Sequence, residues 1–157
     1  MVLHLIGHLQ KNKVRKAIKL YDYIQTVDSL SLAKKINKIA AEEHKVQKVF
    51  LQVNIGNLEN RYGFSTKEIE TAANIINLYK NISIEGIMII PPITKDNTKY
   101  LNYFKMANKI QKKIKKTIKT CTKLSMGMTG DYVDAIKAGA THIRIGTALF
   151  GDREKWL

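Results

Sequence analysis

The sequence holds little of what marks a secreted or membrane-bound protein. Cys121 is the single cysteine among 157 residues, so no disulfide can form within the chain, and a lone thiol fits a reducing compartment. No hydrophobic run approaches the length that a transmembrane helix needs. The apolar stretch Val2–Ile6 is too short for a secretory signal and is followed at once by Gly7 and basic residues. These absences predict a cytoplasmic protein in which Cys121 is a buried thiol rather than a nucleophile.

Acidic residues are also scarce. The chain has 13 Asp and Glu against 27 Lys and Arg, a net charge of +14, which makes nucleic-acid binding one hypothesis. Many of the lysines lie in residues 105–119, where an apolar residue recurs every fourth position, at Met106, Ile110, Ile114 and Ile118. This pattern is typical of an amphipathic helix that docks by one stripe. A solvated helix face therefore explains the charge better than a nucleic-acid partner does.

The sequence is rich in alternating strand and helix patterns. Strands are predicted at Val2–Ile6, Tyr23–Val27, Val49–Ile55, Ile84–Ile90, Lys123–Met126 and His142–Ile145. Helices are predicted at Asn12–Leu20, Leu30–His44, Thr66–Tyr79, Asn97–Lys119 and Tyr132–Ala138, with caps at Asp28 and Ser29, at Ser65 with Glu68, and at Asp131. Such alternation predicts an α/β fold of right-handed βαβ units with a parallel sheet. No linker divides the chain, so residues 1–157 are expected to form one domain.

The number of units is too small for a closed barrel. A TIM barrel needs eight βα units, and about six are present here. A doubly wound open sheet could use six strands, but it would carry a glycine-rich turn after the first strand, where this chain continues as Gly7-His8-Leu9. The sequence therefore predicts an incomplete (β/α)8 barrel, an open arc of parallel strands that lacks the first two units.

Two segments late in the chain combine a short strand with a turn rich in Ser, Thr and Gly. They are residues 124–131 and 142–151. Unpaired amides at a helix N-terminus attract anions, and barrels often bind phosphate in the loops after their last two strands. These turns are therefore predicted to bind phosphate, although Ser125 and Thr147 could instead be ordinary helix caps.

Six motifs in order along the chain resemble the pyridoxal phosphate homeostasis protein family, whose fold is like the N-terminal barrel of alanine racemase. They are Leu5–Lys13, Gln52–Asn54, Arg61–Phe64, Glu85–Pro91, Leu124–Met128 and Arg144–Gly151. The resemblance implies a barrel that binds pyridoxal 5′-phosphate (PLP) and buffers it or delivers it to apo-enzymes, with no established catalytic reaction. Arg61, where the family more usually has Lys, and Thr129, where it usually has Ser, are mild departures.

The resemblance also implies which residues meet the phosphate. Ser125 is similar to the hydroxyl that contacts the phosphate after the seventh strand, with Gly127 and Met128 lining that turn. Gly146 and Thr147 resemble the second phosphate turn. No catalytic residue and no metal ligand are predicted.

Four further residues are implied to lie near the pyridine ring. Arg144 resembles the arginine that approaches the ring nitrogen, where a cation keeps that nitrogen unprotonated. Asn54 and Met88 are similar to ring-side contacts, and His8 lies at the same rim. Structural alternatives stay open, because Arg144 could pair with a core carboxylate, Met88 could fill the core, and His8 could be an ordinary loop histidine.

The family attaches PLP through a lysine on its first strand, and no lysine here fits that position. Lys48 and Lys123 stand at the opposite ends of their strands, while Lys11 and Lys13 lie on a loop or a first helical turn. The chain is therefore expected to hold PLP without a covalent bond. It could be a fragment, draw its first units from another polypeptide, or be a degenerate remnant. An amino-acid racemase is the enzyme alternative, disfavoured because the chain ends after its eighth unit without a further β domain.

Overall fold

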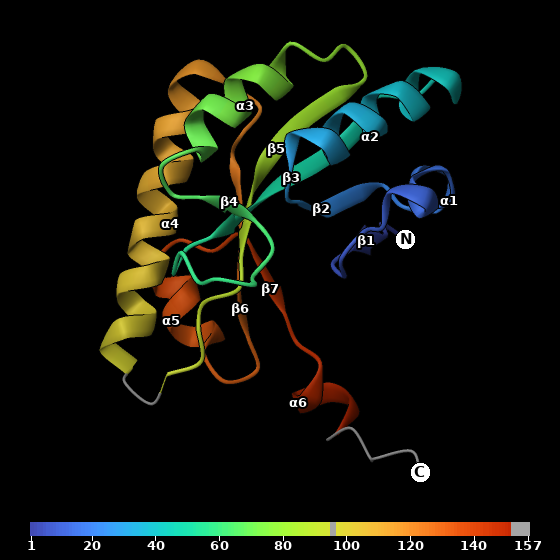
Figure 1. Ribbon diagram of the computed structural model, residues 1–157. Coiled ribbons are helices and arrows are strands. Elements are labelled where there is room, and N and C mark those ends of the chain that lie inside the picture. The colour runs from blue at the N-terminus through green and yellow to red at the C-terminus, as the bar shows by residue number, and fades with distance from the viewer. Residues whose placement is uncertain (95–96, 152–157) are drawn as a thin grey trace.

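Strands and helices alternate along residues 1–94 and 97–151, which are the residues that the computed structural model describes (Figure 1). The strands are β1 (His4–Leu5), β2 (Tyr23–Val27), β3 (Gln47–Asn54), β4 (Phe64–Ser65), β5 (Ile82–Ile89), β6 (Lys123–Met128) and β7 (His142–Arg144). The helices are α1 (Val14–Leu20), α2 (Leu30–Glu42), α3 (Ile69–Asn77), α4 (Asn97–Thr117), α5 (Tyr132–Lys137) and α6 (Thr147–Phe150), with a 3-10 turn at Lys11–Lys13. The end of the expected domain, residues 152–157, lies outside the described residues.

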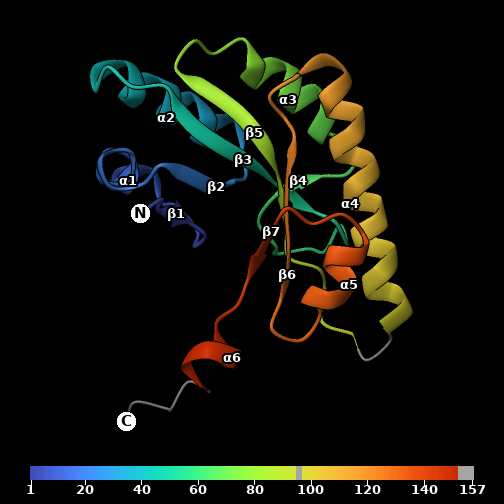
Figure 2. The ribbon, with the colours of Figure 1, turned by 180° about the vertical axis from the view of Figure 1, so that it is seen from behind.

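The sheet is parallel throughout and follows the chain. Its strand order is β1-β2-β3-β5-β6-β7, and the short β4 pairs with β3 off this path. The sheet curls so far that the rings of His4 in β1 and His142 in β7, the two edge strands, lie 5.5 Å apart. Seen from behind, the twisted strands run through the middle of the molecule, with α1 and α2 on one side and α3, α4 and α5 on the other (Figure 2). The predicted incomplete barrel with an open arc is confirmed.

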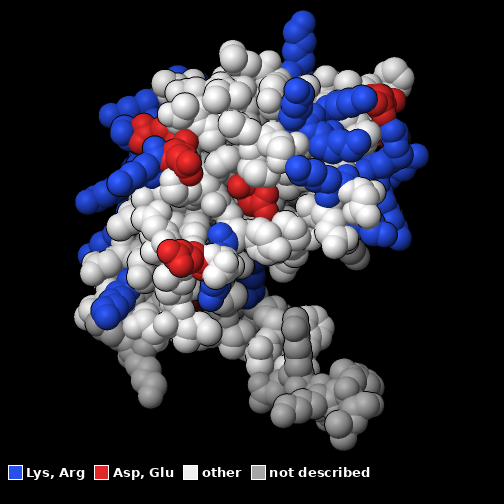
Figure 3. Space-filling model, viewed as in Figure 1, with Lys and Arg blue, Asp and Glu red and all other residues white. Residues whose placement is uncertain are grey.

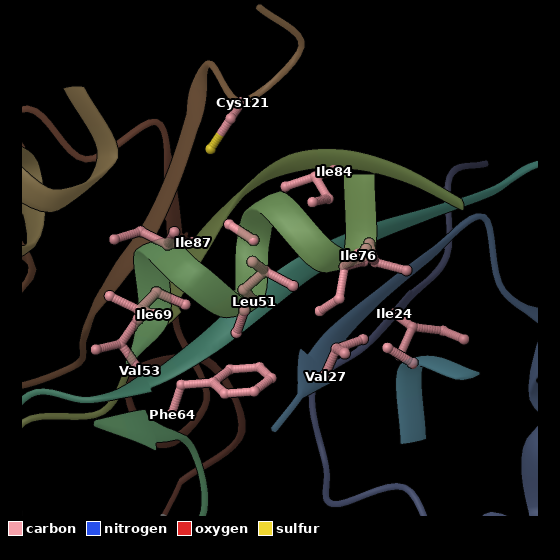
Figure 4. Close-up of a cluster of buried hydrophobic side chains, with 14 of the residues drawn as sticks. Ile24, Val27, Leu51, Val53, Phe64, Ile69, Ile76, Ile84, Ile87 and Cys121 are labelled. Carbon is pink, nitrogen blue, oxygen red and sulfur yellow. The ribbon is translucent and has the colours of Figure 1, made fainter. Parts of the chain in front are cut away.

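The helices cover the outer face of the sheet, and one apolar core lies between them. Along β3, Val49, Leu51 and Val53 point into this core, while Phe50 and Gln52 point to the inner face, as the two-residue period of a strand requires. Figure 4 shows Leu51 and Val53 next to Ile69 and Ile76 of α3. Cys121 is fully buried in this core, as expected, and burial raises the pKa of its thiol to about 12, which disfavours the nucleophilic thiolate.

The predicted apolar stripe of α4 is wrong at its N-terminal end. Met106 is 41% exposed, whereas Phe104 and Ala107 are fully buried, and the buried face continues through Gln111 and Ile114. An α-helix completes a turn every 3.6 residues, so a strict spacing of four drifts away from the buried face within a few turns. Most α4 lysines point to solvent, and Figure 3 shows Lys and Arg gathered over α4 on one side and over α1 and α2 on the other.

Two of the three predicted caps form, one at the start of α2 and one in the turn just before α3, whose N-cap residue Glu68 makes no side-chain capping bond to the helix. The Ser29 hydroxyl accepts a hydrogen bond from the Leu32 amide at the start of α2. Ser65 and Glu68 form reciprocal bonds in which each side chain accepts from the other's amide. Asp131, however, makes no capping bond to α5, because its carboxylate accepts from the Met128 amide at 2.6 Å instead.

Element boundaries differ from the predicted ones mainly at the ends. β1 covers only His4–Leu5 of the predicted Val2–Ile6, and β4 was not predicted, because two residues are too few to show a strand period.

No helix within the described residues is long and apolar enough to cross a membrane.

Candidate functional site

A cavity of about 800 Å³ opens where β6 and β7 end, on the inner side of the curled sheet. Its walls come from both edges of the sheet and from the two predicted phosphate turns. Lining it are His4, Ile6, Gln25, Ile90, Met128, Thr129, Gly130, His142, Ile143, Arg144, Ile145, Gly146 and Thr147. The cavity therefore brings together four of the predicted site residues, namely Met128, Arg144, Gly146 and Thr147, and its size suits a small cofactor.

The two predicted phosphate turns touch each other. The Thr129 hydroxyl after β6 accepts a hydrogen bond from the Ala148 amide in α6 at 3.4 Å. Thr147 is the first residue of α6, so its amide has no acceptor within that helix. The Thr147 hydroxyl is exposed and makes no hydrogen bond within the part of the chain that the structure describes. It is therefore available to a ligand rather than serving as a cap.

Gly127 shapes the first turn through its backbone. Its φ of +92° is one that side chains rarely adopt, and a Cβ there would lie 2.6 Å from the Ala135 Cβ of α5. Gly127 is buried and does not line the cavity, so its side-chain-free backbone lets α5 approach the turn while Met128 reaches the wall.

Arg144 is held by hydrogen bonds at both terminal nitrogens. Its Nη1 donates to the Ser125 hydroxyl oxygen at 2.8 Å, and its Nη2 donates to the Ile89 carbonyl at 2.9 Å. Ser125 is fully buried within β6, where its hydroxyl donates to the Gln25 side-chain oxygen at 2.6 Å. Ser125 does not line the cavity, and it is not a helix cap.

The Arg144 charge is not neutralised by the protein. Among residues 1–94 and 97–151 no carboxylate lies within ion-pair distance of its guanidinium, so the alternative of a core ion pair is not realised. Burial lowers the pKa of Arg144, and the more distant Asp131 acts against this, yet an arginine stays protonated in proteins. A half-buried cation without an acidic partner is costly, and an anionic ligand would offset that cost.

Two histidines, which sequence reasoning missed, lie on the same inner face. The His142 ring packs against the Phe50 ring at 5.4 Å, and the His4 ring stacks on Tyr23 at 4.4 Å. Burial is the main cause that lowers the pKa of both histidines. For His4, Asp22 acts against it and Lys123 adds to it, while for His142 both His4 and Lys123 add to it. Both are therefore neutral near pH 7. Alternation along the strands could have placed them on the inner face, but only the curl brings the two edges together.

Besides Ser125 and Gly127, three predicted residues lie outside this cavity. Asn54 bonds to the backbone of Leu58, accepting from its amide at 3.1 Å and donating to its carbonyl at 2.8 Å, which holds the loop after β3. Met88 is fully buried beside Ser125 in the sheet register. His8 stacks on Tyr62 at 3.8 Å in a separate cleft.

The four lysines that the sequence analysis considered, at positions 11, 13, 48 and 123, do not line the cavity. Lys48 and Lys123 lie at the start of β3 and β6, where their ammonium groups sit over the Tyr23 ring at 5.4 and 5.3 Å. Lys123 also pairs with Glu85. Within the described ranges, no three His, Cys, Asp or Glu side chains are grouped so that they could hold a metal ion.

The chain is similar in sequence to proteins of one family. Residues 1–154 match the alanine racemase N-terminal domain family. The chain is 40% identical over 151 residues to the pyridoxal phosphate homeostasis protein of Synechocystis, covering 96% of this chain and 69% of that protein. It is 33% identical to the protein of the same name from Vibrio alginolyticus, of which it covers 65%.

Solved structures of related proteins have the same fold as this chain. The structure of PipY from Synechococcus elongatus with PLP bound matches at a TM-score of 0.87 and 33% identity, over 96% of this chain and 71% of that chain. An alanine racemase from Clostridium difficile, at 20% identity and a TM-score of 0.78, shares the fold over 99% of this chain and 41% of its own. The chain thus belongs to the pyridoxal phosphate homeostasis protein family and has the fold of the alanine racemase N-terminal domain.

Proposed function

We propose that this chain binds PLP in the cavity at the ends of β6 and β7 and takes part in vitamin B6 homeostasis. One observation carries the proposal: the two turns and an unpaired arginine converge on one cavity of about 800 Å³. The name of the Synechocystis relative and the PLP bound to PipY point the same way. PLP would supply a phosphate dianion for the turns and an electron-poor ring with an aldehyde.

Each part of the cavity has a proposed role in holding PLP. The backbone of Gly146–Thr147, with the Thr147 hydroxyl, offers donors to the phosphate. The turn at Gly127–Met128, whose Met128 amide donates to the Asp131 carboxylate, borders the same phosphate position. Arg144 would hold the pyridine nitrogen unprotonated, so the bound ring would be a weak electron sink. This combination suits storage and release of the cofactor better than chemistry on a substrate.

Reversible binding is proposed because none of the described residues that line the cavity is a lysine. Without an imine, affinity rests on the phosphate contacts and the ring contacts alone. The recipients of PLP would then be apo-enzymes of the cytoplasm, and residues 1–157 would act as one domain.

The proposal is tested by titrating the purified chain with PLP, following its absorbance, and then adding borohydride, which traps any imine as a stable amine. We expect saturable, reversible binding with only scattered, low-level lysine labelling by mass spectrometry. Pyridoxal without phosphate serves as the control ligand and should bind much more weakly. Stoichiometric labelling of one lysine, with Lys13 the first to inspect, would contradict noncovalent binding, and the absence of saturable binding would contradict the function itself.

A further inference from the structure

Gln25 is a buried polar residue that the proposed function leaves without a role. It lies in β2, near the opposite edge of the sheet from Arg144, and is only 3% exposed. Its side-chain oxygen accepts from the Ser125 hydroxyl at 2.6 Å, and its side-chain nitrogen donates to His4 Nδ1 at 2.8 Å. Gln25 therefore links three strands across the interior, and burial of an amide is favourable only when such bonds are made.

The bond from Ser125 to Gln25 determines what Ser125 can do for Arg144. A serine hydroxyl has one proton and two acceptor positions. Because the proton points to Gln25, the oxygen lone pairs are free to accept from Arg144 Nη1, which they do at 2.8 Å. If the Gln25 acceptor were absent, the Ser125 proton could rotate, and the hydroxyl would no longer be held as an acceptor for the guanidinium.

The guanidinium of Arg144 is thereby fixed at two points. Ser125 holds Nη1 and the Ile89 carbonyl holds Nη2, while the side chain still lines the cavity. Two contacts to a rigid planar fork define its plane. A charged group held in place before the ligand arrives loses less freedom on binding, which strengthens the contact.

We propose that Gln25 is a positioning residue for Arg144 and acts through the hydroxyl of Ser125. This inference rests on the proposed function for its consequence, which is tighter PLP binding. It also assigns Ser125 to the arginine rather than to the phosphate, since Ser125 could donate to a phosphate only by leaving Gln25. His4 completes the arrangement by accepting from the Gln25 nitrogen, which requires a neutral imidazole.

The test uses Gln25→Leu, which keeps the approximate volume of the side chain and removes both hydrogen bonds. The first readout needs no ligand: rotation of the Arg144 guanidinium, measured by ¹⁵N NMR of arginine side chains, should become faster. The second readout is PLP affinity, which should fall by about tenfold, as expected for a contact to a charged group that is no longer held in place. In an Arg144→Ala background the same substitution should have no further effect.

Gln52→Leu is the matched control. Gln52 is also a buried glutamine on an inner strand position, but its nitrogen donates to the Tyr62 carbonyl at 3.2 Å, away from Arg144. The Gln52→Leu substitution should leave the rotation of the Arg144 guanidinium and the PLP affinity unchanged. If Gln25→Leu does not fold, Gln25→Met removes the same acceptor with a more flexible side chain and should also speed the rotation. Ser125→Ala removes the hydroxyl that Arg144 itself contacts and gives the rotation rate expected when that contact is lost completely.

The two proposals fail in different ways. Unchanged Arg144 rotation in Gln25→Leu or Gln25→Met, or an equal loss of affinity with and without Arg144, would overturn the positioning role. A wild-type chain that binds no PLP would contradict the proposed function, while the rotation measurement would still decide whether Gln25 positions Arg144.

Discussion

Arg144 dominates the chemistry of the cavity. It is a permanent cation, half-buried, held by neutral groups and not matched by any carboxylate among the described residues. Its place on the last strand could be read from the sequence motif, but its partners could not. Ser125 and Ile89 precede Arg144 by 19 and 55 residues, and only the curled sheet brings them to it.

Thr147→Val should weaken PLP binding by about 1.5–3 kcal/mol, because valine has nearly the same shape and lacks the hydroxyl that would donate to a charged phosphate. Isothermal titration of both proteins with PLP measures the difference. Thr117→Val, at the exposed end of α4, is the control and should bind like the wild type. Equal affinities for wild type and Thr147→Val would show that this hydroxyl does not contact the ligand.

The neutral His4 and His142 should make stability depend on pH. Burial lowers the pKa of both histidines below the ordinary 6.5, so the unfolded chain binds protons more readily than the folded one. The stability that this provides is complete above pH 6.5 and is lost as the pH falls through the lowered pKa values. The free energy of unfolding, measured in urea, should therefore decrease as the pH is lowered from about 7.5 to about 5.5.

His142→Asn should flatten this pH dependence, by at most about 1.4 kcal/mol per pH unit, the limit for one proton. His44→Asn is the control: His44 is exposed after α2 at a φ of 51°, a conformation that asparagine tolerates. Identical slopes for the two variants would show that His142 titrates in the same way in the folded and unfolded chain.

At the scale of elements, the turn after β6 depends on a glycine. Gly127→Ala should destabilise the fold by about 1–3 kcal/mol, because the new Cβ would clash with Ala135 of α5 and the backbone has a positive φ. Gly130→Ala, in the same turn with nothing within 4 Å of the added carbon, is the matched control and should change stability little. Urea unfolding of both variants measures the contrast, and a Gly127→Ala protein as stable as Gly130→Ala would contradict it.

The face of α4 that packs into the core gives a second contrast in stability between two variants. Ile114→Ala should cost about 2–5 kcal/mol, since Ile114 is 3% exposed in the core. Met106→Ala should cost much less, because Met106 is 41% exposed. Similar losses in the two variants would favour the stripe that the sequence predicts over the one that the structure has.

At the scale of the whole molecule, we expect ligand binding to stabilise the fold, because the walls of the cavity belong to both edges of the sheet. His4 and Gln25 come from β1 and β2, and Arg144 comes from β7. PLP at 100 times its dissociation constant should therefore stabilise the chain by about 2.7 kcal/mol. Thermal unfolding with and without PLP measures this, with Arg144→Ala as the variant that should lose most of the shift. An unchanged midpoint at saturating PLP would mean that the ligand does not bind the folded state.

The sequence by itself determined the class of fold, because the periods of two and 3.6 residues are local. Tyr23–Val27 was predicted with the bounds that the structure has, and the capping bonds at Ser29 and Ser65 were predicted from short-range patterns. The two turns that are proposed to bind phosphate were located for the same reason, since Gly127 and Thr147 each lie within a few residues of their own strand.

Only the tertiary structure decided which residues meet across the interior. Curling brings Gln25 to Ser125, 100 residues away, and His4 to His142, and no local period carries that information. The same curl leaves Asn54, Met88 and His8 off the cavity wall, although each lies on or next to a strand of the sheet. The face of a strand is a local property, whereas the partner across a barrel depends on the curvature of the whole sheet.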